Sequence, residues 1–214
     1  MGISENGMFG ANKGKVGNLV YYTRNGKNVV RTVGKNLKEP SEAQLRSRLE
    51  MKVSSTFSKL VKPFIDYGFA AHIVGKDLSQ FNVCTGYTRN NALKGEYPDI
   101  SVDYEKVVLS EGPLMPAYQA AATIVPEGLE VSWYVAEDLP WPDNTDQVML
   151  LAYFPETEQV IYNLFGADRT VGKSLLKISE PLLTRHFETY VAFISADRTR
   201  VSDSVYIGGF NQPA

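Results

Sequence analysis

The sequence predicts an α+β protein: a basic N-terminal β-hairpin arm, a helical segment and an antiparallel β-sandwich. Three observations support this fold class. An Asn-Gly pair separates two β-rich runs near the N-terminus, apolar residues recur at helical spacing between residues 45 and 64, and short β-rich runs alternate with turn residues from about residue 102. We therefore expect three regions, at 1–40, 41–98 and 102–209.

The first region is expected to contain an extended arm and a hairpin. Residues 1–14 are rich in Gly and Asn and show little periodicity, whereas the β-rich runs at 19–23 and 28–33 flank Asn25-Gly26. Asn-Gly is a strong hairpin signal because a type I′ turn needs a positive φ at both central residues. A two-stranded hairpin is marginal by itself in water. It should therefore lie on the protein's own body, on another copy or on a ligand.

A helix is expected to begin after Ser41, because Ser41 followed by Gln44 matches a capping box. Its apolar residues form one stripe at helical spacing, and Pro63 should kink or end the helix near its last turn. The stripe comprises Leu45, Leu49, Val53, Phe57, Leu60, Val61 and Phe64. A second, weaker helix is expected over 78–93.

From about residue 102 the chain changes to short β-rich runs between turn clusters. About eight such runs with turns every 8–12 residues are typical of an immunoglobulin- or fibronectin-like sandwich. The predicted strands are 104–109, 120–125, 129–135, 148–154, 160–165, 175–178, 189–195 and 201–207. The last two are expected to form a closing hairpin.

Charge is divided unevenly along the chain. The first 62 residues carry twelve Lys+Arg and four Asp+Glu, whereas the remaining 152 carry ten and twenty, within a formal net charge of −2. A basic part joined to an acidic part suits one of two partners: an anionic polymer, or the acidic face of a neighbouring copy.

The composition also bears on location. No apolar run is long enough to span a membrane, and the N-terminus lacks the apolar region of a secretion signal. Cys84 is the single cysteine, which excludes an internal disulfide framework and fits a small packed side chain in a reducing compartment. These features favour a virion or a cytoplasmic location.

The sequence shows no catalytic constellation. Residues 166–174 resemble a phosphate-binding loop, but five residues instead of four precede Gly172-Lys173-Ser174, which predicts a connection between strands. His72 and His186 are far apart and lie in no metal-ligand pattern. We therefore expect no catalytic residue, cofactor or metal. A hydrolase acting through the acidic 137–146 segment, read more simply as a solvated turn, remains an alternative.

The candidate partner-binding residues lie mainly in the hairpin, where basic and aromatic residues interleave. They are Lys15, Tyr21, Tyr22, Arg24, Lys27, Arg31 and Lys35, with Trp141 as an exposed aromatic in a Pro-rich loop. We expect the tyrosines to act by burial and the cations by pairing with carboxylates.

Three alternatives use the same features. The hairpin residues, with Arg46, Arg48 and Lys52, could contact phosphates and stack bases, as in a nucleic-acid-binding protein. The hairpin could instead pack on its own helix and complete a monomeric core. A surface module that binds carbohydrate or protein would rest on Trp141.

Several short motifs along the chain occur together in one known family. They are Gly14-Lys15-Val16-Gly17-Asn18, Tyr22, Gly26-Lys27, Arg31, Pro40, Glu42-Ala43-Gln44 and Arg48. This set resembles the N-terminal signature of a family of uncharacterised proteins from Bacteroidetes genomes and their phages, and the similarity extends to Gly208. The resemblance implies a lineage and one architecture, without an activity. We therefore expect a non-enzymatic assembly protein of a phage particle or a similar multisubunit structure.

Overall fold

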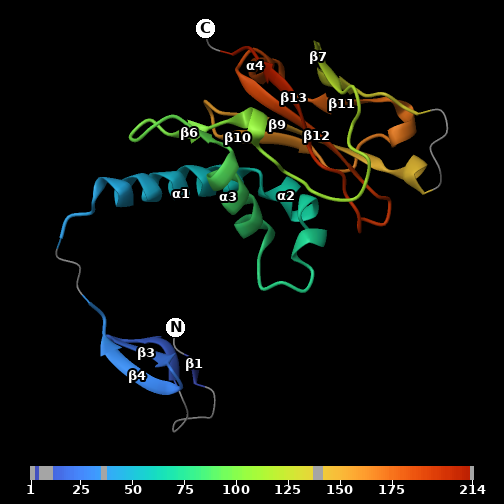
Figure 1. The fold of residues 1–214 in the computed structure, drawn as a ribbon. Coiled ribbons are helices and arrows are strands. Elements are labelled where there is room, and N and C mark those ends of the chain that lie inside the picture. The colour runs from blue at the N-terminus through green and yellow to red at the C-terminus, as the bar shows by residue number, and fades with distance from the viewer. Residues whose placement is uncertain (1–2, 5–11, 35–37, 137–141, 213–214) are drawn as a thin grey trace. The chain divides into compact units, whose positions relative to one another are not determined.

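The structure is a computed structural model that describes residues 3–4, 12–34, 38–136 and 142–212 (Figure 1). Helices and antiparallel sheets are both present, as the predicted α+β class requires. The chain divides into two compact units, Met1–Ser41 and Glu42–Ala214. We call the sheet of the first unit the N-terminal sheet and the second unit the C-terminal unit.

The N-terminal sheet has four antiparallel strands in the order β1-β2-β3-β4. Their bounds are Ile3–Ser4, Asn12–Val16, Leu19–Arg24 and Lys27–Thr32. Asn25 and Gly26 connect β3 to β4 with φ angles of 49° and 74°, which confirms the predicted hairpin. Where residues 1–14 are described, they supply β1 and part of β2 in place of the expected extended arm.

Three α-helices open the C-terminal unit: α1 (Glu42–Leu60), α2 (Lys62–Gly68) and α3 (Gln80–Asn91). Helix α1 begins directly after Ser41, as predicted. It ends before Pro63, which lies in the first turn of α2, where a missing N–H costs no hydrogen bond. Helix α3 corresponds to the predicted second helix and is capped by Ser79, whose Oγ accepts a hydrogen bond from the Asn82 N–H.

The rest of the C-terminal unit contains two larger sheets, of order β10-β9-β12-β13 and β11-β8-β7. The strands are β7 (Ala121–Val125), β8 (Gly128–Ser132), β9 (Gln147–Phe154), β10 (Gln159–Asn163), β11 (Lys173–Lys177), β12 (Phe187–Ile194) and β13 (Val205–Phe210). A small ribbon pairs β5 (Leu93–Lys94) with β6 (Ser101–Val102), and α4 (Glu180–Leu183) precedes β12.

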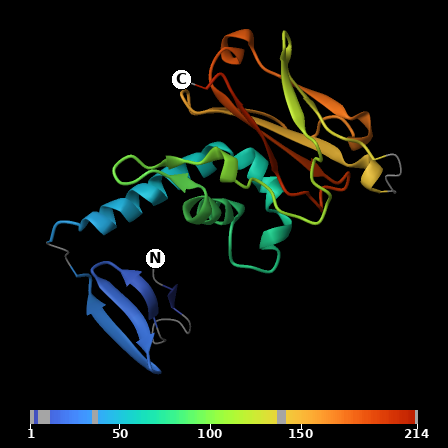
Figure 2. The same cartoon turned by 45° about the horizontal axis from the view of Figure 1, so that its top comes forward.

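The sheet of order β10-β9-β12-β13 is covered on both faces (Figure 2). Along β9, Met149 and Leu151 pack with Phe57 of α1 and Phe64 of α2, whereas the alternate residues pack against the three-stranded sheet. Alternate side chains of a strand point to opposite faces, so β9 and β12 are apolar at almost every position. The helices thus complete a core that the two sheets alone would leave half open.

Two predicted strands differ from the structure. Residues 104–109 form a short 3₁₀ turn, η3 (Tyr104–Lys106), and an irregular segment. There Val107 and Leu109 are buried, and the Leu109 N–H donates to Ser204 Oγ at 2.8 Å. A side chain therefore satisfies a backbone group for which a strand partner was expected. The last strand was predicted at 201–207 and lies at 205–210. It begins later than predicted because Val201 and Ser202 form only isolated bridges.

Candidate interaction sites

The N-terminal sheet has two chemically different faces, which the strand register defines. Val20 of β3 lies opposite both Lys15 of β2 and Arg31 of β4, and Arg24 lies opposite Lys27. Directly opposed residues of an antiparallel pair share a face, as do residues two apart along one strand. One face, which we call the basic face, therefore carries Lys15, Arg24, Lys27 and Arg31 around Val20, Tyr22 and Val29.

The opposite face carries no charge on its paired strands. It presents Val16, Leu19, Tyr21 and Val30, with a cross-strand hydrogen bond from Thr23 Oγ1 to Asn28 Oδ1 of 3.4 Å. Tyr21 was expected to act beside Tyr22, but the register places the two tyrosines on opposite faces. The apolar side chains of the uncharged face are the more exposed. Val30 is 50% exposed, whereas Val20 and Val29 of the basic face are half-buried.

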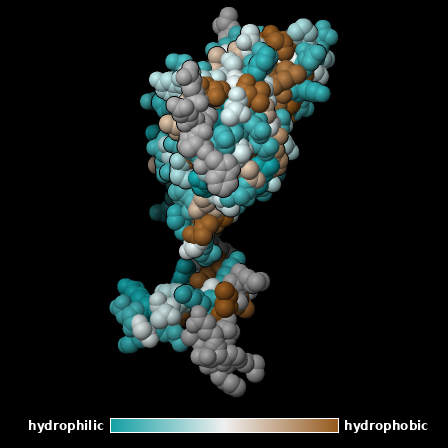
Figure 3. Space-filling model, turned by 90° about the vertical axis from the view of Figure 1, so that its right-hand side faces the viewer, coloured by the Kyte–Doolittle hydropathy of each residue, from teal (hydrophilic) through white to brown (hydrophobic). Residues whose placement is uncertain are grey.

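Neither face of the N-terminal sheet forms a core. Among residues 12–34 no side chain is buried, and both hydrophobic and hydrophilic residues reach the surface (Figure 3). The same residues include five Lys or Arg and no Asp or Glu. The four cations of the basic face form no ion pair within the described parts of the chain. This face therefore presents unneutralised positive charge.

Two predicted partner-binding residues, Lys35 and Trp141, lie outside the residues that the structure describes. Of the cations in the nucleic-acid alternative, Arg46 lies on α1 and pairs with Glu50 at 3.0 Å. Arg48 and Lys52 are also on α1, in the C-terminal unit. Within the described N-terminal sheet, the structure thus gathers Lys15, Tyr22, Arg24, Lys27 and Arg31 on one face and places Tyr21 on the other.

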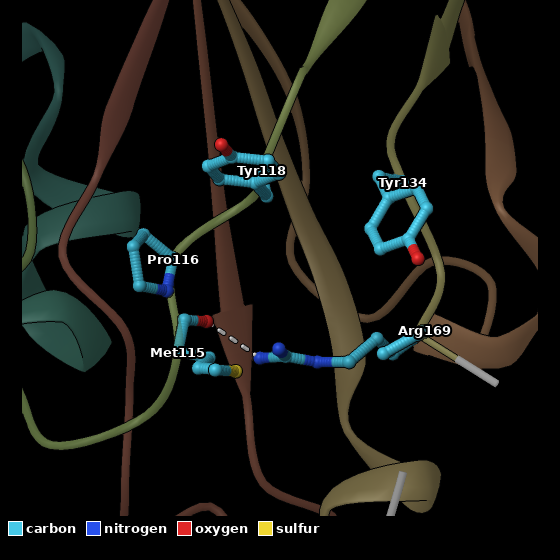
Figure 4. Close-up of a pocket in the computed structure, with 6 residues that line it drawn as sticks. Met115, Pro116, Tyr118, Tyr134 and Arg169 are labelled. Carbon is cyan, nitrogen blue, oxygen red and sulfur yellow. Dashed lines mark hydrogen bonds between the residues drawn. The ribbon is translucent and has the colours of Figure 1, made fainter. Parts of the chain in front are cut away.

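A second candidate site is a pocket of about 300 Å³ on the C-terminal unit (Figure 4). We call it the tyrosine pocket; it is lined by Met115, Pro116, Tyr118, Tyr134, Ala136 and Arg169. The chain positions the two tyrosines at the ends of β7 and β8, where the Tyr134 N–H donates to the Tyr118 carbonyl at 2.9 Å. Their ring centroids are 6.3 Å apart and the planes meet at 76°.

Arg169 forms the floor of the tyrosine pocket and is held from several sides. Its Nη2 donates to the Met115 carbonyl at 2.7 Å and lies 3.2 Å from Asp146 Oδ2, and its guanidinium lies over the Phe193 ring at 3.9 Å. Burial raises the pKa of the Asp146 carboxyl, and the Arg169 guanidinium opposes that shift. The acidic segment was predicted to be a solvated turn, but Asp146 is buried.

Arg169 belongs to the segment that resembles a phosphate-binding loop. That segment runs from β10 in one sheet to β11 in the other and contains a 3₁₀ turn, η5 (Arg169–Val171). The Arg169 carbonyl accepts a hydrogen bond from Trp133 Nε1 at 2.8 Å. The segment is therefore a connection between strands, as predicted.

His72, His186 and Cys84 are not among the described residues that line the tyrosine pocket. His186 Nε2 lies 2.8 Å from Glu188 Oε1, and Glu188 Oε2 accepts from the Tyr206 hydroxyl at 2.6 Å. His72 lies 3.6 Å from Glu111. Cys84 is buried beside Ser58, which donates to its Sγ at 3.4 Å, and burial raises the pKa of its thiol. Cys84 is thus a packed side chain.

The described residues include neither a metal-binding cluster nor a membrane-spanning helix. Over 3–4, 12–34, 38–136 and 142–212, no group of three or more His, Cys, Asp or Glu could hold a metal ion. Over those same ranges, no helix has the length and hydrophobicity needed to cross a membrane.

Comparison with known proteins identifies a family and gives no activity. No curated protein matches the sequence. A family model described as "Family of unknown function (DUF6266)" matches residues 11–208, which include strands β2, β3 and β4, the helices and all but the end of the two larger sheets. The chain therefore belongs to the DUF6266 family.

Proposed function

We propose that this chain is a non-enzymatic structural protein of a multisubunit assembly, such as a phage particle. It docks through the basic face of its N-terminal sheet onto an acidic protein surface, that of a neighbouring copy. The observation that carries the proposal is the register that gathers Lys15, Arg24, Lys27 and Arg31 around Tyr22. The absence of a catalytic constellation in the sequence supports the non-enzymatic role.

The basic face favours an acidic partner for an electrostatic reason. Arg24 and Lys27 lie directly opposite each other, and like charges in that position destabilise a strand pair. Residues 12–34 contain no Asp or Glu, so no carboxylate among them can offset this repulsion. Carboxylates of another subunit would relieve it, and an Arg side chain can hold a carboxylate through two parallel hydrogen bonds.

A second copy of the chain has the required charge. Residues 42–214 carry 15 Lys+Arg and 22 Asp+Glu, whereas residues 1–41 carry seven and two. Opposite net charges on the two units favour contact between the sheet of one copy and the C-terminal unit of the next. Such head-to-tail contacts generate rings or filaments. Tyr22, at the centre of the basic face, would supply the buried anchor.

The C-terminal unit suits the role of a scaffold. We propose that its two larger sheets form a fibronectin-like sandwich of the immunoglobulin class. The strand order supports this: β7, β8 and β11 take the places of strands A, B and E, while β9, β12 and β13 take those of C, F and G. Such sandwiches serve many unrelated functions, so the function rests on the docking site.

A second candidate function is the binding of single-stranded nucleic acid. One observation favours it: Tyr22 lies among four cations on one open face, which is how basic sheets stack bases and contact phosphates. The acidic C-terminal unit opposes it, because its net charge repels phosphates. We therefore rank it below docking to an acidic protein surface.

The test uses size-exclusion chromatography with light scattering at low and high salt. We expect oligomers of the wild type that weaken with salt, and their loss when Lys15, Arg24, Lys27 and Arg31 are all changed to Glu. The matched control changes four exposed lysines of the C-terminal unit to Glu: Lys59, Lys76, Lys94 and Lys177. Because both variants change the net charge equally, only the position of the charges differs.

Two results would overturn this assignment. If the wild type is monomeric at low salt, or if both variants assemble like the wild type, the basic face is not an assembly surface. A monomeric wild type that binds a single-stranded oligonucleotide, with binding lost only in the first variant, would establish the second candidate instead.

A further inference from the structure

The tyrosine pocket exposes several large side chains together. Met115, Tyr118 and Tyr134 are 70%, 67% and 56% exposed, and with Pro116 they surround one depression. Soluble proteins rarely gather apolar surface in this way unless it is a binding site. The two rings stand at 76° to each other and form two walls of different orientation (Figure 4). Walls of this kind can hold a compact, apolar ring.

The polar groups of the pocket are hydrogen-bond donors. Arg169 is 5% exposed and its Nε–H has no hydrogen-bond partner, although its Nη2 is bonded to Met115. The Tyr134 hydroxyl points toward the Arg169 side chain (Figure 4). A buried donor without a partner is destabilising, so an acceptor that reached it would be favoured. Among the described residues that line the pocket, none has a carboxylate or carboxamide side chain.

The charge of the pocket selects a neutral occupant. Arg169 is the one charged residue among the described lining residues, and the buried Asp146 carboxylate lies 3.2 Å from the guanidinium. A phosphate or carboxylate would therefore meet little net positive charge. A sugar would bring many hydroxyl donors, for which the described lining side chains offer mainly the two tyrosine hydroxyls as acceptors.

An extended proline-rich segment meets all these requirements. Proline has no N–H, so each proline brings a carbonyl acceptor without a donor, and its ring is compact and apolar. Aromatic-lined grooves are a known way to bind such segments. We propose that the tyrosine pocket binds a proline-rich segment of a partner protein, with the proline rings against Tyr118 and Tyr134 and a carbonyl at Arg169. This site lies on the C-terminal unit and does not depend on the basic face.

The test titrates the full-length chain with a blocked oligoproline peptide, followed by isothermal calorimetry and by the NMR signals of the tyrosine rings. We expect saturable binding that shifts the Tyr118 and Tyr134 signals. A blocked peptide of equal length with alanine in place of proline should bind at least about tenfold more weakly. Tyr118→Ala and Tyr134→Ala should each weaken oligoproline binding by about tenfold.

Two sets of variants complete the design. Tyr162→Ala removes a tyrosine of β10 that is 43% exposed and does not line the pocket, so binding should be unchanged. Tyr118→Phe and Tyr134→Phe keep the rings and remove the hydroxyl donors, so they should weaken binding less than the alanine variants do. Because Tyr118 and Tyr134 are largely exposed, all four pocket variants should fold.

Three results would overturn the proposal: no saturable binding of oligoproline, equal binding of the alanine peptide, or binding that Tyr118→Ala and Tyr134→Ala leave unchanged. Saturable binding of a neutral oligosaccharide, lost in the same variants and with no binding of oligoproline, would assign the pocket to sugars and also overturn it.

Discussion

The N-terminal sheet and the C-terminal unit differ in how far their apolar side chains are buried. In the C-terminal unit the central sheet is covered by helices on one face and by a second sheet on the other, and its large aromatic residues are buried. In the N-terminal sheet no side chain among residues 12–34 is buried. The C-terminal unit is therefore stabilised by its own core, whereas the described residues of the N-terminal sheet contribute no buried side chain.

The largest expected contrast comes from removing one apolar side chain in each region. Phe64→Ala empties a buried position and should lower the free energy of unfolding of the C-terminal unit by about 3–5 kcal/mol. Val30→Ala, at a half-exposed position of β4, should change it by less than about 0.5 kcal/mol. Urea denaturation followed by the fluorescence of buried Trp133 measures both. Equal losses would mean that the sheet and the core unfold as one unit.

A buried and an exposed ion pair give the next contrast. Asp146→Asn leaves the Arg169 guanidinium buried without a carboxylate and should cost about 3 kcal/mol of stability. Arg200→Ala removes a pair with Asp143 at 3.9 Å, in which both side chains are 40% exposed, and should cost less than about 1 kcal/mol. Thermal unfolding of both variants at one pH tests the difference. A cost for Asp146→Asn no larger than that for Arg200→Ala would contradict it.

A smaller effect is expected within the N-terminal sheet. Lys27→Glu turns the like-charge pair with Arg24 into an attractive pair and should stabilise the hairpin by about 0.2–1 kcal/mol. Lys27→Gln removes only the repulsion and should give a smaller gain. Amide hydrogen exchange of β3 and β4 reports this local stability. Faster exchange in both variants would show that Lys27 stabilises the free sheet.

The smallest effect concerns the turn after β12. Hydrogen bonds from Ser195 Oγ and from the Thr199 N–H and hydroxyl lower the pKa of Asp197 from 3.8 to about 2. Because its folded pKa is depressed, this carboxylate contributes stability that is fully present above pH 3.8 and is lost as the pH falls toward about 2. NMR titration of Asp197, and the acid stability of Asp197→Asn, should show this window. A carboxyl that titrates at its ordinary value would contradict it.

Local chemistry explains which elements were predictable. Asn25-Gly26 determines its own turn, and Ser41 and Pro63 mark helix limits through backbone rules that need no distant partner. Residues 104–109 look like a strand because they are rich in β-forming residues. They form instead a 3₁₀ turn and an irregular segment, in which Leu109 is buried and its N–H is satisfied by Ser204, which is far away in the sequence.

The candidate sites were harder to predict for the same reason. The cations of the hairpin were found from composition, but only the register shows that Tyr22 shares their face and Tyr21 does not. The tyrosine pocket left no local signal, since Tyr118, Tyr134 and Arg169 come from three separate connections of the sheets. Likewise, no spacing rule pairs Asp146 with Arg169.

The uncovered N-terminal sheet has a consequence for how assembly would respond to concentration. A segment that is marginally stable alone and stable when bound gains stability with the logarithm of the free partner concentration. Its folded fraction would then be low in a dilute chain and would rise as subunits accumulate. Proteolysis between residues 12 and 34 would report that change directly, because a protease cleaves the unbound sheet and spares the bound one. Assembly through the sheet would therefore depend steeply on the concentration of subunits.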